Sequence, residues 1–193
     1  MSSIIVAGDT SGTCTLQAPA VAGSTVLTLP AVSGTVITNT AGVVTQAMLA
    51  TNVAGNGPAF SAYANTLQTI SNATFTQITF GVEEFDTNSN FSASRFTPTV
   101  AGYYQLCGAI SINGLINSRV ICIYKNGAEF KRCVMMGGYS NLGSTTYPFS
   151  ALVQANGSTD YFEIYVYQDS GTSQNANAGQ SNVFFMGSLA RST

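Results

Sequence analysis

Polar and apolar residues alternate along much of the chain after residue 58, which is the pattern of half-buried β-strands. In residues 99–112 the apolar face consists of Tyr104, Leu106, Ile110 and Ile112, and the opposite face of Gln105, Cys107, Ala109 and Ser111. In residues 161–168 the aliphatic face consists of Phe162, Ile164 and Val166. Burying each of these three side chains stabilises a fold by roughly 1.5–3 kcal/mol, so we expect that face to line a core.

Two Asn-Gly pairs predict hairpins between such strands. Asn126-Gly127 separates residues 119–124 from 129–135, and Asn156-Gly157 separates residues 150–154 from 161–168. Asn-Gly is the strongest short-range hairpin signal, because both residues tolerate positive φ. Several short strands joined by turns, without a helical period, indicate a β-sandwich.

The first hairpin also bears on the cysteines, which stand at positions 14, 107, 122 and 133. A two-residue turn pairs Lys125 with Ala128 and Cys122 with Lys131, and it places Cys133 diagonal to Cys122. Diagonal neighbours are about 7–8 Å apart, which is too far for easy bridging. We therefore expect free thiols, as is usual without export.

The first 57 residues have a different composition. All 20 aromatic residues lie at or after Phe60, and Asp9 is the only charged residue before residue 58. A segment with so few large side chains cannot easily bury its own core, yet it is too rich in Val and Thr for a typical disordered tail. We expect an extended β-arm that pairs with a neighbouring chain, ahead of a folded domain over residues 58–193.

Within this arm, residues 19–23 recur as residues 30–34, and each Pro/Gly corner precedes a strand-like run, over residues 25–29 and 35–38. Residues 46–53 could form one or two helical turns or a plain loop. Residues 52–57 contain two glycines and are predicted to be a hinge.

Charge is scarce: Asp, Glu, Lys and Arg make up 7% of the chain, against about 25% in typical proteins. A neutral surface carries little repulsion and suits a large assembly. The net charge of −2 gives no basic footprint for nucleic acid. The sequence shows neither a signal peptide nor an apolar run long enough for a membrane span, so we expect synthesis in a cytoplasm and no membrane insertion.

The sequence contains no histidine, which excludes Ser-His-Asp and Cys-His catalysis and any zinc site that uses histidine. No nucleotide-binding glycine motif occurs. Glu83, Glu84 and Asp86 form the one carboxylate cluster. Such carboxylates could serve a glycosidase or bind calcium, but a solvated strand end is the simpler interpretation. We expect no enzyme activity, cofactor or metal.

Motifs over residues 58–193 resemble the C1q/TNF-like family. Residues 58–62 are similar to its opening strand, and residues 85–86, 95–98 and 101–104 to its central Y-D … F-x-x-P-x-x-G-x-Y pattern. The further matches are residues 125–127, 152–166 and 183–189. Asp160 departs from the pattern, because it follows Gly157 by three residues rather than one, which suggests a longer turn.

This resemblance implies a ten-stranded jelly roll that packs as a homotrimer, with one sheet face along the three-fold axis. The face of Tyr161, Tyr165 and Tyr167, shared with Glu163, is a candidate for that interface, and ordinary packing within one chain is the alternative.

Residues 10–40 are similar to an element of tailed-phage fibre and particle-attached proteins. The residues expected to attach the chain to a particle are Leu16, Pro19, Val21, Leu27, Leu29, Pro30, Val36 and Ile37. These resemblances imply a non-enzymatic protein of a bacteriophage virion, made in the bacterial cytoplasm and exposed on the particle. Its expected partners are itself and other virion proteins such as the major capsid protein.

Two virion roles stay open at this point: a capsid decoration, cement or head-fibre protein, and a short tail fibre that binds a host surface glycan. The short N-terminal segment leaves no room for a long fibre shaft and favours the first. The second role would use polar, glycine-bearing loops at residues 137–141 and 169–181, although each could be a plain surface loop. The candidate ligand residues there are Tyr139, Asn141, Asp169, Asn175 and Asn177.

Overall fold

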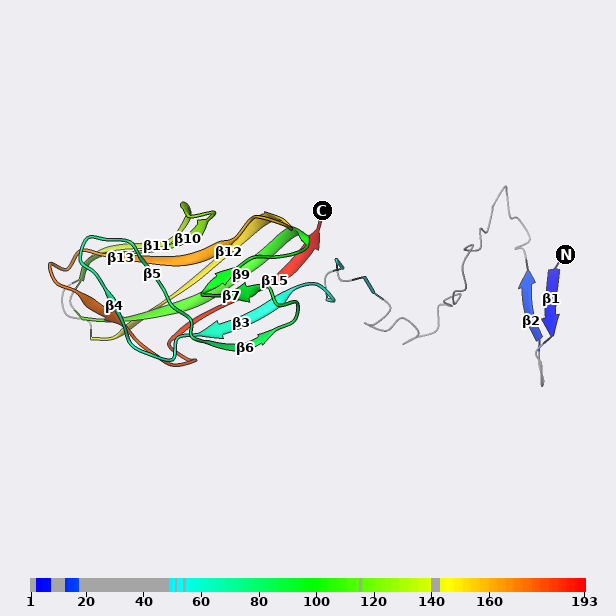
Figure 1. Cartoon of the computed structure of the whole chain (residues 1–193), viewed down its shortest axis with the longest axis horizontal. Coiled ribbons are helices and arrows are strands. Elements are labelled where there is room, and N and C mark those ends of the chain that lie inside the picture. Colours follow the sequence, from blue (N-terminus) through cyan, green and yellow to red (C-terminus); the bar gives the residue numbers. More distant parts are fainter. Residues whose placement is uncertain are drawn as a thin grey trace. The chain divides into compact units, whose positions relative to one another are not determined.

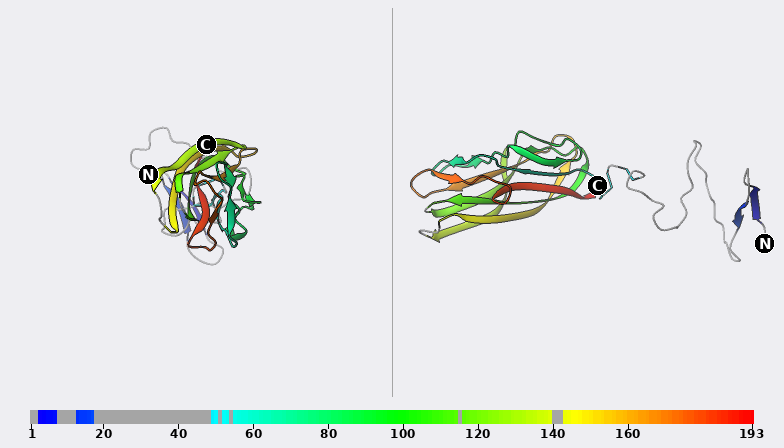
Figure 2. Two further views of the ribbon diagram at one scale, coloured as in Figure 1. Left: turned by 90° about the vertical axis from the view of Figure 1, so that its left-hand side faces the viewer. Right: turned by 90° about the horizontal axis from the view of Figure 1, so that it is seen from below.

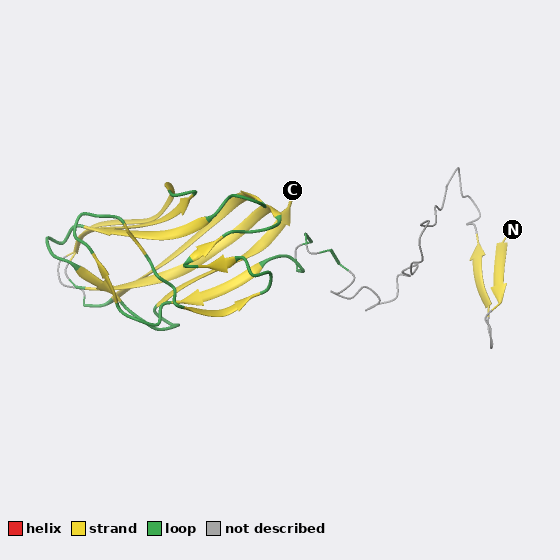
Figure 3. Cartoon of the chain, viewed as in Figure 1, coloured by secondary structure: helices red, strands yellow, loops and turns green. Residues whose placement is uncertain are grey.

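The computed structural model describes residues 3–7, 13–17, 49–50, 52–53, 55–114, 116–139 and 143–193. Among these residues every regular element is a β-strand, which confirms the all-β class (Figure 3). The chain divides into two compact units, residues 1–43 and 44–193. The second unit thus begins ahead of the composition break at residue 58, and we call its residues 58–193, which contain both sheets of the sandwich, the head.

In the first unit, β1 (Ser3–Ala7) pairs antiparallel with β2 (Thr13–Gln17). The pairing places Leu16, one of the expected attachment residues, opposite Ile4. The other seven attachment residues, the internal repeat and both strand-like runs lie outside the described residues.

The head is a sandwich of two antiparallel sheets (Figures 1 and 2). The six-stranded sheet contains β5 (Thr76–Gln77), β7 (Phe91–Ser92), β8 (Arg95–Phe96), β10 (Ile116–Lys125), β11 (Ala128–Tyr139) and β13 (Phe162–Gln168). The seven-stranded sheet contains β3 (Ala59–Tyr63), β4 (Gln68–Ile70), β6 (Val82–Asp86), β9 (Ala101–Asn113), β12 (Thr145–Asn156), β14 (Gln174–Ala176) and β15 (Val183–Ser192). The strand number exceeds the ten expected because β4, β5, β7, β8 and β14 are fragments of two or three residues.

The strand order places sequence-distant segments side by side. The six-stranded sheet runs β11-β10-β13-β8-β7, with β5 beside β13. The seven-stranded sheet has β12 and β15 on either side of β9, and continues from β15 through β3 to β6. Near residue 113, β14 and then β4 extend it.

The core lies between the sheets and follows the alternation in the sequence. Phe162, Ile164 and Val166 are fully buried, as predicted. The predicted inner face of β9, which comprises Tyr104, Leu106, Ile110 and Ile112, is also fully buried. An aromatic cluster surrounds Phe60, whose ring stacks on Phe96 with the centroids 4.3 Å apart. Such ring pairs add about 0.5–1.5 kcal/mol beyond area burial.

The Asn126-Gly127 turn forms as predicted, with φ of 55° and 77°, and it pairs Lys125 with Ala128. Three residues further from the turn the predicted pairing was wrong: Cys122 lies opposite Arg132, not Lys131. Two irregularities in the β10–β11 pairing shift the register, because a bulge adds an unpaired residue to one strand.

Three cysteines, Cys107, Cys122 and Cys133, are free thiols, as predicted. The side chain of Cys14 lies outside the described residues.

The hairpin predicted at Asn156-Gly157 was wrong, because β12 pairs with β9 in the seven-stranded sheet and β13 with β10 in the six-stranded sheet. The turn after Asn156 therefore crosses from one sheet to the other, and it is long, as the displaced Asp160 suggested. Asn156 Oδ1 accepts hydrogen bonds from the N–H groups of Ser158, Thr159 and Asp160, each 3.0 Å long. Asp160 Oδ2 in return accepts the N–H of Asn156 at 2.9 Å.

Ahead of β3, the described residues form turns rather than a helix, so the loop alternative is correct for them. Asn56 closes the segment, since its N–H donates to Val53 O at 2.9 Å and its Nδ2 to Leu49 O at 2.7 Å. Gly55 has a φ of 93°, a left-handed conformation that interrupts any helix here.

Candidate functional site

On the outer surface of the seven-stranded sheet, two adjacent rows of residues carry no charge, with Arg191 beside Tyr103 and Glu84 beside Ser61 at their margins. One row of paired residues crosses five strands: Ser150, Cys107, Met186, Ser61 and Phe85. The next row consists of Leu152, Gln105, Ser188 and Ala59. Neither row contains a charged side chain. We call the surface made by these two rows and by Tyr103 the open face.

Large apolar side chains stand out from the open face. Phe85 is 52% exposed, Leu152 54% and Tyr103 38%. A shallow hollow of about 190 Å³ lies between Phe85, Cys107 and Met186. Exposed apolar surface of this kind, on a sheet with no second layer of its own chain, is typical of protein–protein contact.

The tyrosine face of β13 lies on the other sheet and is largely occupied. Tyr165 stacks on Tyr124 with the ring centroids 3.9 Å apart, and the ring centroids of Tyr167 and Phe75 are 5.2 Å apart. The Arg95 guanidinium lies 3.8 Å from the centroid of Tyr161. These contacts favour packing within one chain for the tyrosines.

Arg95 also neutralises Glu163, the carboxylate that lies among these tyrosines. Glu163 is buried, and its Oε1 accepts hydrogen bonds from Arg95 Nε at 3.0 Å and Nη2 at 2.9 Å. Gln77 Nε2 donates to the same oxygen at 3.2 Å. This arrangement fixes β5, β8 and β13 against one another.

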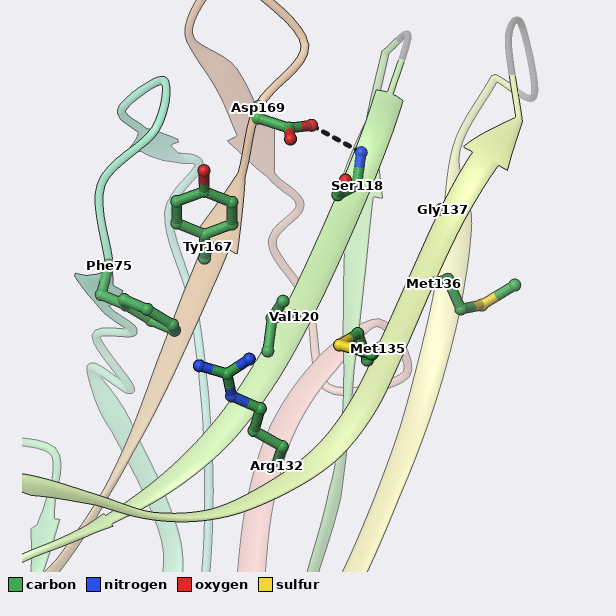
Figure 4. A pocket seen from close by; sticks show the side chains of 9 residues that line it. All are labelled: Phe75, Ser118, Val120, Arg132, Met135, Met136, Gly137, Tyr167 and Asp169. Atoms are coloured by element: carbon green, nitrogen blue, oxygen red, sulfur yellow. Dashed lines mark hydrogen bonds between the residues drawn. The ribbon is translucent and has the colours of Figure 1, made fainter.

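Further along the same surface is a groove of about 580 Å³, which we call the β10–β11 groove. It is lined by Phe75, Ser118, Val120, Arg132, Met135, Met136, Gly137, Tyr167 and Asp169. Figure 4 shows Tyr167 and Phe75 on one side of Val120 and Met135 on the other, with the Arg132 guanidinium reaching toward Val120. Pairing places Val120 between Tyr167 and Met135, so one sheet row forms the floor.

Two charged side chains of the groove are held in place. Asp169 Oδ1 accepts the N–H of Ser118 at 2.6 Å. Arg132 donates from Nε to Glu129 Oε1 at 2.5 Å and from Nη2 to Glu129 Oε2 at 3.1 Å. The hydrogen bonds from Arg132 hold the pKa of Glu129 below its ordinary value. The guanidinium is therefore an oriented donor whose charge is already matched.

Of the predicted ligand residues whose side chains the structure describes, only Asp169 lies in this groove. Asn175 lies on β14, where its Oδ1 accepts a hydrogen bond from Thr69 Oγ1 at 3.3 Å. The expectation of a loop throughout residues 169–181 was therefore wrong for this strand. Asn177 Nδ2 donates to Ser111 Oγ at 2.8 Å and to Ser144 Oγ at 2.6 Å.

The loop predicted at residues 137–141 is also partly a strand, because β11 extends to Tyr139 and pairs it with Ile116. Asn141 lies outside the described residues. Sequence analysis missed Phe75, Val120 and Met135 as groove residues. The adjacent methionines beside Arg132 on an alternating strand were the one available signal.

The carboxylate cluster of β6 is engaged locally. Glu84 accepts hydrogen bonds from Ser61 Oγ and Gln180 Nε2. Asp86 Oδ2 accepts the N–H of Phe91 at 2.7 Å, across the turn that follows β6. In the described part of the chain, no group of three His, Cys, Asp or Glu side chains is arranged to hold a metal ion. Across the same residues, no helix has the length and hydropathy required to cross a membrane.

Solved structures identify the architecture of the head. Murine APRIL matches it with a TM-score of 0.53 at 9% identity, over 68% of this chain and 98% of that one. Eiger, a TNF from S. frugiperda, matches with a TM-score of 0.52 at 11% identity, over 70% and 93%. The head has a TNF-like jelly-roll fold.

The globular domain of zebrafish complement 1qA is 17% identical over 70% of this chain and 99% of that one, with a TM-score of 0.48. No protein-family model and no curated protein sequence matches the chain. At identities this low the likeness establishes the jelly-roll fold alone, and function has to be argued from the surfaces of the head.

Proposed function

We propose that this chain is a non-enzymatic structural protein of a bacteriophage particle. Three copies associate through the open faces of their jelly-roll heads, and the N-terminal arm docks the trimer on other virion proteins, the major capsid protein among them. The observation that carries the proposal is the uncharged open face, which crosses five strands.

Self-association follows from what the open face exposes. Phe85 and Leu152 are each more than half exposed, and full burial of such side chains stabilises by about 1.5–3 kcal/mol each. No charged group of either row has to lose its hydration on contact. The C1q/TNF resemblance implies a trimer with one sheet face along the three-fold axis, and the open face suits that position better than the tyrosines, whose rings already contact their own chain.

Native mass spectrometry of the full chain tests this association. We expect three chains for the wild type and one chain for Leu152→Glu, which introduces charge at the contact. Phe130→Glu is the matched control, because Phe130 is 44% exposed on the other sheet, and it should remain trimeric. A monomeric wild type at micromolar concentration, or dissociation by Phe130→Glu alone, would refute the proposed interface.

Docking on a particle is assigned to the arm because of its composition. Ordering an extended segment costs about 1–2 kcal/mol of backbone entropy per residue, which only extensive strand pairing or packing can offset. A segment with one charge and no aromatic residue offers mainly backbone groups and small apolar side chains for this purpose. The β1–β2 hairpin is the part of it with described pairing.

Deletion of residues 1–57 tests the role of the arm. The truncated head should retain the circular dichroism and melting of its sheets but fail to join particles during assembly. Normal occupancy of the truncated head on particles would place the contacts in the jelly roll instead.

A second candidate, a short tail fibre that binds a host glycan, is favoured by one observation, the β10–β11 groove. Cryo-electron microscopy of purified particles separates the two roles. Density for the trimer on the capsid supports decoration, cementing or a head fibre, whereas density on the tail supports the fibre. The absence of the chain from particles would refute both.

A further inference from the structure

We infer that the β10–β11 groove is a binding site for a neutral hexose, such as one residue of a surface polysaccharide. This goes beyond the structural role proposed above, which requires no ligand. The groove is built from one chain, and its volume of about 580 Å³ lies within the ordinary range for small-molecule sites, about 300–1,000 Å³.

The apolar part of the groove fits the C–H face of a sugar ring. Phe75 and Tyr167 lie on one side of Val120, and Met135, which is 71% exposed, lies on the other (Figure 4). Aromatic faces carry partial negative charge, so they attract the weakly positive C–H groups of a pyranose. Mutual contact between Phe75 and Tyr167 holds both rings in place before any ligand arrives.

The polar part of the groove fits sugar hydroxyls. A carboxylate has about four lone-pair sites, so Asp169 can accept hydroxyl protons in addition to the Ser118 N–H that orients it. Arg132, oriented by Glu129, can donate to a hydroxyl oxygen from the same strand face. The groove thus offers an acceptor and a donor for the hydroxyls of a hexose, beside an aromatic surface for its C–H face.

Charge decides between a neutral and an acidic sugar. Arg132 is paired with Glu129, and Asp169 adds a second carboxylate, so the three side chains together carry a formal charge of −1. A carboxylate or phosphate on the ligand would be repelled by the Asp169 carboxylate, and the charge of Arg132 is already matched by Glu129. The groove therefore favours neutral hexoses.

The position of the groove within the head agrees with a ligand that approaches from outside. The chain enters the head beside the end of β15, where Leu189 N donates to Pro58 O at 2.9 Å. The groove residue Ser118 lies at the other end of β10 from Lys125, whose Nζ donates to Gln154 O near that entry. The groove thus lies toward the end of the head remote from residue 58.

The methionines supply the test. In the full chain labelled with ¹³C at the methionine methyl groups, Met135 and Met136 report on the groove, and Met186 on the open face reports on nonspecific effects. Methyl β-D-glucoside, β-D-galactoside and α-D-mannoside are titrated to millimolar concentration. At least one should shift the Met135 and Met136 signals saturably and leave Met186 unmoved. The matched acidic sugar, methyl β-D-glucuronide, should bind at least tenfold more weakly than methyl β-D-glucoside or not at all.

Variants localise the effect. Asp169→Asn keeps an acceptor for Ser118 but loses the charge, and Phe75→Leu removes a ring; each should weaken binding at least tenfold. Phe130→Ala on the same strand is the control and should bind as the wild type does. The inference is overturned if none of the three neutral glycosides shifts the two methionines, if the glucuronide binds more tightly, or if both groove variants bind normally. Leu152→Glu should bind as well as wild type, so failure of the trimer proposal and failure of this site can be told apart.

Discussion

Arg119 Nη1 donates a 2.7 Å hydrogen bond to the hydroxyl of Tyr147 inside the core, which ties β10 of one sheet to β12 of the other. Arg119 is fully buried, and no carboxylate among the described residues forms an ion pair with it. Its guanidinium also lies over the Tyr147 ring, 4.9 Å from the centroid. Its Nε has no hydrogen-bond partner among the described residues, and burial lowers the pKa of the group.

Tyr147→Phe should lower the free energy of unfolding by about 1–3 kcal/mol, because it removes a partner from a buried charged donor. Arg119→Met should be neutral or stabilising, since it removes the charge and retains an apolar chain. In the Arg119→Met background, Tyr147→Phe should then cost almost nothing. Urea denaturation of the four proteins measures this cycle, and equal costs of Tyr147→Phe in both backgrounds would contradict the coupling.

The Arg95–Glu163 and Arg132–Glu129 ion pairs on the six-stranded sheet should contribute different free energies to folding, because their burial differs. Arg95→Met leaves the buried Glu163 without its cation and should cost about 3–5 kcal/mol. Arg132→Met breaks a solvent-exposed pair and should change the free energy of unfolding far less, because solvent screens the interaction. Chemical denaturation of both variants decides the point. Similar losses in the two would show that the burial of Glu163 is not what matters.

Asp160 should make stability depend on acid. Burial raises the pKa of Asp160, but hydrogen bonds from Lys125, Asn126 and the N–H of Asn156 outweigh it and hold the pKa below 3.8. A carboxyl with a lowered pKa in the folded state stabilises the fold above its unfolded pKa, and this contribution is lost as pH falls through the folded value. Wild type should therefore exceed Asp160→Asn in stability at pH 7, and the gap should close below about pH 3.8. Thermal melts across pH 2–7 would show a constant gap if the interaction is not ionic.

Thiol reactivity should report on the open face. Cys122 is fully buried, and burial raises its pKa to about 12, so it should resist a disulfide reagent at pH 8 in every folded form. Cys107 lies on the open face and should react slowly in the trimer but faster in Leu152→Glu. A Cys14→Ser, Cys133→Ser background isolates the two thiols, and denaturant should expose both. Equal rates for Cys107 in trimer and monomer would argue against its burial at the interface.

Local patterns predicted the features that depend on a few neighbouring residues. The buried face of Phe162, Ile164 and Val166 followed from strand alternation, and the Asn126-Gly127 turn from the tolerance of both residues for positive φ. The displacement of Cys122 was not predictable in this way, because a bulge responds to the packing of the whole sheet rather than to the turn.

The candidate sites, by contrast, could not be predicted from neighbouring residues, because the assembled sheets create them. Phe75, Val120, Met135 and Tyr167 stand far apart in the sequence, and only the order β11-β10-β13 brings them to one surface. The open face depends likewise on β3, β9 and β15 lying side by side. Arg119 occupies an inward position of β10 that alternation assigns to an apolar residue, and its partner Tyr147 comes from the opposite sheet.

The pairing of Gly102 with Ser192 has a practical consequence for engineering. It places residue 193 at the end of the head where residue 58 begins, whereas Asn113 and Asn175 pair at the far end of β9, about 36 Å away at ~3.3 Å per residue. A peptide fused after residue 193 would emerge among the proposed docking contacts. A peptide inserted at Gly171, in an exposed turn with a φ of 91°, would project from the remote end, which makes this turn the better position for cargo displayed on a particle.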